Sequence, residues 1–157
     1  MLGYSLLMRI AFTLALLVLS IDILSGAQAQ SAKPLNVDPE QVHRVEILYY
    51  PEQILVRAAL TPERLEELYK YKLEIKVVHQ RAEWQQLRSL LAETSVTPSG
   101  QSYDHRTAVL LFDQNGRRMA SLYFAQFGKD GTINGVSGSI KGGVYHWAKS
   151  LLRGVPE

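Results

Sequence analysis

The chain has 157 residues, of which 46% are hydrophobic and 20% are charged, and it carries a formal net charge of +2 and no cysteine. So small a net charge gives no reason to expect nucleic acid or a polyanionic ligand as a partner. The lack of cysteine excludes disulfides, thiol catalysis and cysteine-ligated zinc.

Residues 1–29 have the pattern of a cleavable signal peptide. Arg9 supplies a positive charge, residues 10–19 form an apolar core, and Ala27-Gln28-Ala29 is a small-x-small cleavage site. The alternative is a retained membrane anchor, but a spanning helix needs about 20 apolar residues, and Asp22 interrupts this run. We therefore expect cleavage before Gln30 and no membrane attachment of the mature protein.

Export and the absence of cysteine together indicate the compartment. An exported protein of this size without disulfides is ordinary in a bacterial periplasm, so we predict a periplasmic or secreted protein. Met8 is an alternative start of translation, because Met8-Arg9 would place the positive charge beside the initiator.

The mature chain is expected to consist of a lead-in, residues 30–41, and a single α+β domain, residues 42–157. The lead-in has two prolines and no periodicity, which predicts a flexible segment. The remaining residues suffice for one hydrophobic core and leave no room for a second domain.

Strands and helices alternate in the first half of this domain. Apolar and polar residues alternate over residues 43–50, and Pro51-Glu52 breaks this run before a second segment, residues 54–59, which predicts a hairpin. Thr61-Pro62-Glu63 follows as a helix start, with an N-cap residue and a proline in the first turn.

The next segments repeat this alternation of strand and helix. Residues 71–77 alternate throughout, which predicts a strand with one buried face and one charged face. Helical spacing predicts a helix over residues 81–93, with Trp84 turned inward. Residues 94–104 have no periodic signal and are expected to form a long loop.

A hairpin organises the second half of the domain. Two β-forming runs, residues 107–112 and 119–125, flank Asn115-Gly116, a typical sequence for a tight primed turn. The first run has almost no polar residue, so it should be covered on both faces. A glycine-rich strand within residues 132–140 and a helix over 141–152, with Trp147 inward, complete the order ββαβαβββα.

This order predicts an α+β two-layer sandwich, a mostly antiparallel sheet with about three helices on one face. The other face would then carry Arg44, Tyr50 and Arg57. Because Tyr and Arg are enriched at the centres of protein interfaces, we predict that this face binds another protein. The alternative is a solvated face of weak cross-strand ion pairs.

Tyr123 and Phe127 are further candidate binding residues. Both fall on one side of the second hairpin strand, and helices on a single face of the sheet would leave them partly exposed. A small apolar patch of this kind often marks a binding site. The alternative is that the glycine-rich segment from Thr132 folds back over them.

Recognisable catalytic and metal-binding motifs are missing from the sequence. The four histidines lack the spacing of a zinc site, so no metal or other cofactor is expected. The sequence Gly135-Val136-Ser137-Gly138 lacks the spacing of a nucleophile elbow. The glycines of residues 138–143 lack the spacing of a phosphate-binding loop.

If the protein is an enzyme, Asp104, His105 and His146 are the candidate catalytic residues. His105 would act as a general base oriented by Asp104, and His146 as a second acid or base. Adjacent strand residues point to opposite faces, however, whereas Asp104 and Arg106 point the same way. This spacing favours a structural ion pair that holds the loop to the strand.

Three functional hypotheses follow from the sequence. The first is a small exported protein-binding module of the inhibitor, immunity or adaptor kind, because the chain is short and lacks catalytic motifs. The second is a periplasmic hydrolase that uses the Asp104, His105 and His146 set. The third is a self-associating structural protein of the cell envelope, a homodimer formed through an exposed sheet edge.

Overall fold

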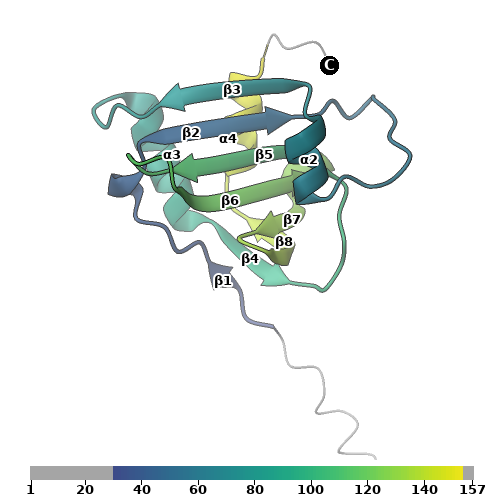
Figure 1. Ribbon diagram of the computed structural model, residues 1–157. Helices are drawn as coiled ribbons and strands as arrows, with labels where there is room; N and C mark the ends of the chain where they lie inside the picture. Colours follow the sequence, from purple (N-terminus) through teal and green to yellow (C-terminus); the bar gives the residue numbers. More distant parts are fainter. Residues whose placement is uncertain (1–29, 154–157) are drawn as a thin grey trace, which may run out of the picture. The chain divides into compact units, whose positions relative to one another are not determined.

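One antiparallel sheet of eight strands organises the fold (Figure 1). The computed structural model describes residues 30–153, so the predicted signal peptide and the alternative start at Met8 lie outside the described residues. The strand order is β1-β4-β8-β7-β6-β5-β2-β3. The strands are β1 (Lys33–Pro34), β2 (Arg44–Tyr49), β3 (Tyr71–Lys76), β4 (Ser95–Pro98), β5 (His105–Phe112), β6 (Arg118–Ala125), β7 (Asp130–Ile133) and β8 (Val136–Lys141).

Helices lie on both faces of this sheet. In Figure 1, α3 (Ala82–Glu93) and α4 (Val144–Leu151) lie behind the sheet, whereas α2 (Pro62–Leu68) lies in front of it. Short 3-10 helices occupy Pro39–Gln41 and Gln126–Gly128. The predicted α+β class with an antiparallel sheet is confirmed, but the expectation that all helices share one face fails for α2.

The main hydrophobic core lies between the sheet and helices α3 and α4. Alternate residues of the central strands, such as Ile47, Val109 and Leu122, belong to it. Trp84 and Trp147 are also in this core and are 5% and 6% exposed, which confirms their predicted inward orientation. All eight residues of β5 are buried, so this strand is covered on both faces, as its apolar sequence predicted.

A second, smaller apolar cluster covers the opposite face of the central strands. Leu48 of β2 and Leu110 of β5 belong to it, together with Leu60 and Leu65. Residues 54–59, predicted as a strand, instead form part of a loop. That loop carries Leu60 to the second face and thereby places α2, which contains Leu65, on the side opposite α3 and α4.

The two Asn-Gly sequences of the chain make different turns. At the β5–β6 hairpin only Gly116 has a positive φ (77°), and its N–H donates to the Asp113 carbonyl at 3.1 Å. This is a type I turn followed by a left-handed glycine, not the primed turn expected. Between β7 and β8, Asn134 (φ 47°) and Gly135 (φ 80°) are both left-handed, so the predicted strand over 132–140 is divided into a hairpin.

The packed part of the chain begins before Val42. Leu35, in the predicted lead-in, is 9% exposed, and its N–H donates to the Thr94 carbonyl at 2.9 Å. The short strand β1 next to it pairs with β4, which lies in the segment predicted as a loop. Strands of two and four residues are too short to show a periodicity, which is why this pairing could not be predicted.

Candidate functional site

Asp104 and Arg106 form the ion pair that their spacing predicted. Arg106 donates to the Asp104 carboxylate from Nη2 at 2.6 Å and from Nε at 2.8 Å. Arg106 also donates from Nη1 to the carbonyls of Pro51 and Ile54, at 3.2 and 3.0 Å. The second Asp104 oxygen accepts the Leu60 N–H at 2.8 Å. The pair therefore ties residues 51–60 to the start of β5.

His105 is buried and its two ring nitrogens are both occupied. Nδ1 donates to the Leu60 carbonyl at 2.9 Å, so in the neutral ring Nε2 accepts from the Thr132 hydroxyl, 3.0 Å away. Burial lowers the pKa of His105, and the bond to Leu60 and the charge of Asp104 oppose that effect only in part. The ring is therefore neutral at pH 7, with no nitrogen left to accept a proton from a substrate.

The three candidate catalytic residues do not come together. His105 packs against Tyr123, with ring centres 5.9 Å apart, on the α2 side of the sheet. His146 is exposed on α4, where its ring lies 5.3 Å from that of Tyr145 in the main core. In residues 30–153, no hydrogen bond joins Asp104 to the His105 ring or either residue to His146.

Tyr123 and Phe127 do not form the predicted exposed patch, because one of them, Tyr123, is buried. Tyr123 is 5% exposed, and its hydroxyl donates to Glu66 of α2, which also accepts two bonds from Arg118 at 2.7 and 2.8 Å. Burial and the bond to Glu66 raise the pKa of Tyr123 to about 12. Phe127 is 68% exposed in a 3-10 turn and not in the strand. The patch fails because α2 covers this face.

The predicted binding face with Arg44, Tyr50 and Arg57 is also largely closed. Tyr50 is buried, with the Arg106 guanidinium 5.5 Å from its ring centre. Arg44 is held by Glu46 of its own strand at 2.9 Å and contacts Glu74 of β3 at 3.6 Å, a cross-strand ion pair of the kind that the alternative described. Arg57 is exposed on the loop after β2. These residues do not form one continuous surface.

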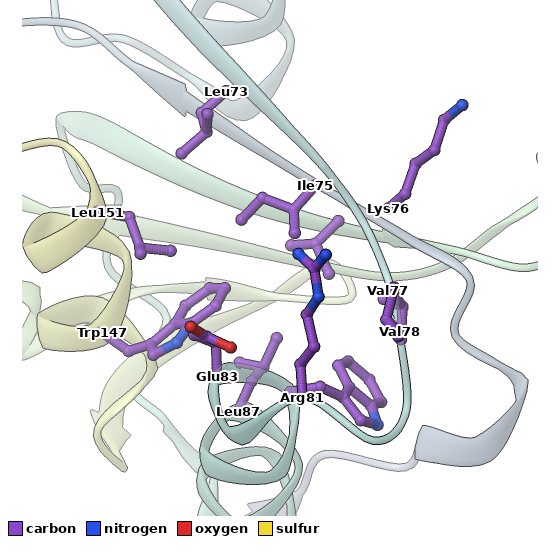
Figure 2. Close-up of a pocket in the computed structure, with 12 residues that line it drawn as sticks. Leu73, Ile75, Lys76, Val77, Val78, Arg81, Glu83, Leu87, Trp147 and Leu151 are labelled. Carbon is purple, nitrogen blue, oxygen red and sulfur yellow. The ribbon is translucent and has the colours of Figure 1, made fainter.

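An open apolar groove of about 270 Å³ lies on the other side of the sheet, between β3 and helices α3 and α4. Figure 2 shows Leu73 and Ile75 extending from β3 above Trp147 and Leu87, with Arg81 reaching toward Ile75 and Lys76 pointing away. The apolar lining comes from Val45, Leu73, Ile75, Val77, Val78, Trp84, Leu87, Trp147 and Leu151, and the charged residues are Lys76, Arg81 and Glu83.

The groove stays open because β3 is the last strand of the sheet. Ile47 and Val45 of β2 are 0% and 1% exposed, whereas their β3 partners Leu73 and Ile75 are only half-buried. Leu151, at the end of α4, is 37% exposed. The main core therefore continues to the surface at this edge, where its side chains are only partly covered.

The outer edge of β3 presents unpaired backbone groups. In the described part of the chain β3 pairs only with β2. The Val77 N–H donates to the His43 carbonyl at 2.9 Å, and inward and outward residues alternate along an antiparallel strand. Lys72, Glu74 and Lys76 therefore direct their N–H and C=O groups away from β2. Such an edge can accept another strand.

No protein-family model matches this sequence, and comparison with curated proteins and with solved structures found no significant similarity. Residues 30–153 contain no cluster of three or more histidine, aspartate or glutamate side chains that could hold a metal ion. None of the described helices is long and apolar enough to cross a membrane.

Among the features of the described residues, the groove and the adjacent β3 edge are the candidate site with the clearest geometry.

Half of this site was predictable from the amino-acid sequence. The alternation over residues 71–77 correctly gave Leu73 and Ile75 an inward orientation. It did not show that the strand is at an edge, because an edge strand and an inner strand with one wet face alternate identically. Lys72 and Lys76 were the available signal, since lysine is common on edge strands.

Proposed function

We propose that this protein is a non-catalytic protein-binding module whose partner docks on β3 as an extended segment. The supporting observation is that the unpaired edge of β3 and the open apolar groove lie side by side. A partner strand would pair with the outward backbone groups of Lys72 and Glu74. Its alternate side chains would then lie beside Leu73 and Ile75, at the groove. This is the recognition mode known as strand addition.

The chemistry of the edge defines the segment that fits. On the groove side, a partner residue meets Leu73 or Ile75, which favours an apolar side chain there. On the opposite side, it meets Lys72, Glu74 or Lys76, which favours a charged or polar side chain. The expected partner segment therefore alternates apolar and charged residues over about five positions, the usual length of a strand.

The predicted export of the chain and its small size suit an inhibitor, immunity or adaptor protein of the periplasm. The hydrolase alternative has less support, because both ring nitrogens of His105 are engaged by Leu60 and Thr132. Self-association is also compatible with the free edge of β3.

Affinity capture with matched surface variants tests the proposal. Leu151 and Leu68 are equally exposed, at 37% and 38%, but Leu151 lines the groove and Leu68 lies on α2. Wild-type protein and Leu68→Glu should capture the same stoichiometric partner from an envelope extract, and Leu151→Glu should not. Equal capture by all three proteins would contradict the proposed site. Turnover of esters or wall fragments that His105→Asn abolishes would favour the hydrolase instead.

A further inference from the structure

The free edge of β3 is complementary to itself in one register. We infer that a second copy of this chain docks there, so that two β3 strands pair antiparallel about a two-fold axis at Leu73. The inference rests on the proposed function in one respect, that the β3 edge accepts a strand. It adds the identity of the partner and the register of pairing.

The two faces of β3 restrict the registers that can form. Tyr71, Leu73 and Ile75 are half-buried on the groove side, whereas Lys72, Glu74 and Lys76 are exposed. Residues directly opposite each other in an antiparallel pair have their side chains on the same face. In a register that pairs odd-numbered with even-numbered residues, apolar side chains would therefore lie beside charged ones, which excludes such registers. In the remaining registers, odd-numbered residues face odd-numbered residues and even-numbered residues face even-numbered ones.

Charge then distinguishes among these registers. With the axis at Leu73, Lys72 lies opposite Glu74 of the second copy, and the symmetry repeats this pair. With the axis at Lys72 or at Glu74, identical charges lie directly opposite each other, which is destabilising. Lys72 also contacts Glu46 at 3.0 Å and Glu74 contacts Arg44 at 3.6 Å. Their side chains remain 35% and 43% exposed, within reach of a neighbouring strand.

A register centred on Ile75 would also pair opposite charges, Glu74 with Lys76. It would extend the ladder to Val77 and Val78, however, where the chain leaves β3 and turns toward α3. The Arg81 N–H donates to the Val78 carbonyl at 2.9 Å in that turn, so a partner strand would run into it. The register centred on Leu73 keeps all five paired residues, 71–75, within β3.

Each end of the ladder adds a like-charged pair, Lys70 of one copy with Lys76 of the other. Lys70 precedes β3, and its ammonium lies 5.7 Å from the ring centre of Tyr50. On the groove side, the same register sets Leu73 against its own symmetry mate and Tyr71 against Ile75. In this dimer the two open grooves lie next to each other, and each copy covers half-buried side chains of the other.

The absence of cysteine from the chain allows a direct test of the register. In Leu73→Cys the new thiol lies opposite its own copy, in a pair that does not exchange hydrogen bonds, with Cβ atoms about 4.5–5.5 Å apart. Mild oxidation should therefore give a covalent dimer. Lys72→Cys is the matched control, because residue 72 faces residue 74, and it should stay uncrosslinked. Faster crosslinking of Ile75→Cys than of Leu73→Cys would overturn the register.

Charge exchange tests the docking without a crosslink. In sedimentation equilibrium of the purified protein, Lys72→Glu and Glu74→Lys should each weaken the dimer about tenfold. The double variant restores both pairs and should return the dimer to within about threefold of wild type. Dimers that are insensitive to both changes would overturn the inference.

These experiments distinguish a failure of the self-docking inference from a failure of the proposed function. A wild-type protein that stays monomeric at every concentration, yet captures another protein through a surface sensitive to Leu151→Glu, overturns the self-docking inference and leaves the proposed function standing. A dimer with the predicted charge dependence, together with capture that Leu151→Glu does not affect, supports the inference and refutes the proposed function.

Discussion

His105 is enclosed by Leu60, Thr132 and Tyr123, and its burial makes the fold sensitive to pH. The pKa of His105 is lowered in the folded protein, while in the unfolded chain it has the ordinary value of 6.5. Below pH 6.5 the unfolded chain therefore binds more protons, so stability is full above this value and declines as the pH falls toward the folded pKa.

The expected result is a lower free energy of unfolding at pH 5 than at pH 7 for the wild-type protein. In His105→Asn, which keeps a donor for the Leu60 carbonyl and does not titrate, this decline should disappear. The control is His146→Gln, which changes an exposed histidine and should keep the wild-type pH dependence. Denaturant titrations at pH 5, 6 and 7 measure all three. Parallel curves for wild type and His105→Asn would contradict the assignment of the buried neutral ring.

Arg106 is 7% exposed, and of its four hydrogen bonds two hold the carbonyls of Pro51 and Ile54 in the loop after β2 and two hold Asp104. Arg106→Met keeps much of the side-chain volume and removes these bonds, so the free energy of unfolding should fall by about 2–3 kcal/mol. The loop should also become more accessible to trypsin at Arg57. Arg64→Met, at an exposed position of α2, should change neither quantity. Unchanged proteolysis in Arg106→Met would mean that other contacts fix the loop.

At the scale of elements, the tryptophans of α3 and α4 attach these helices to the sheet. Both side chains are almost fully buried, so Trp84→Ala and Trp147→Ala should each lower the free energy of unfolding by about 3–5 kcal/mol. Chemical denaturation measures the loss. Values below about 1 kcal/mol would show that the two helical faces contribute little to the core.

Elements whose periodicity covers a full strand or helix were predicted correctly. β5 was recognised as doubly covered because Ala108 to Phe112 offers no polar side chain, and the helical faces of α3 and α4 followed from their tryptophans. Residues 54–59 misled the prediction, because Ile54, Val56 and Ala58 imitate a strand in a loop that Arg106 fixes from β5. Such tertiary control of a local segment leaves no mark in the segment itself.

The site was harder to predict than the elements, for the same reason. Tyr123 was expected at the surface because all helices were assigned to the other face of the sheet, but Glu66 and α2 cover it from a distant part of the sequence. Asp104 and Arg106, in contrast, are two residues apart, and their pairing followed from strand geometry alone. Contacts between residues close in the sequence could thus be predicted. The face that each helix covers and the strand that ends the sheet depend on chain topology and could not.

For the whole molecule, the topology explains why one apolar region remains open. The sheet ends at β3, and α3 and α4 lie over the strands further in, so the core reaches solvent between β3 and these helices. The groove and the unpaired backbone of Lys72, Glu74 and Lys76 both exist because β3 is the last strand of the sheet. A partner strand would complete both the hydrogen bonding and the cover of the core.

Residue-resolved amide hydrogen exchange on β3 directly tests whether this strand is the docking edge. In dilute protein, the outward amides of Lys72, Glu74 and Lys76 should exchange fast, while the inward amides of Leu73 and Ile75 are protected by β2. When a protein partner binds, whether another protein or a second copy at high concentration, the outward amides of Lys72 and Glu74 should become protected. A complex that forms while the exchange of these amides stays fast would contradict the claim that β3 is the docking edge.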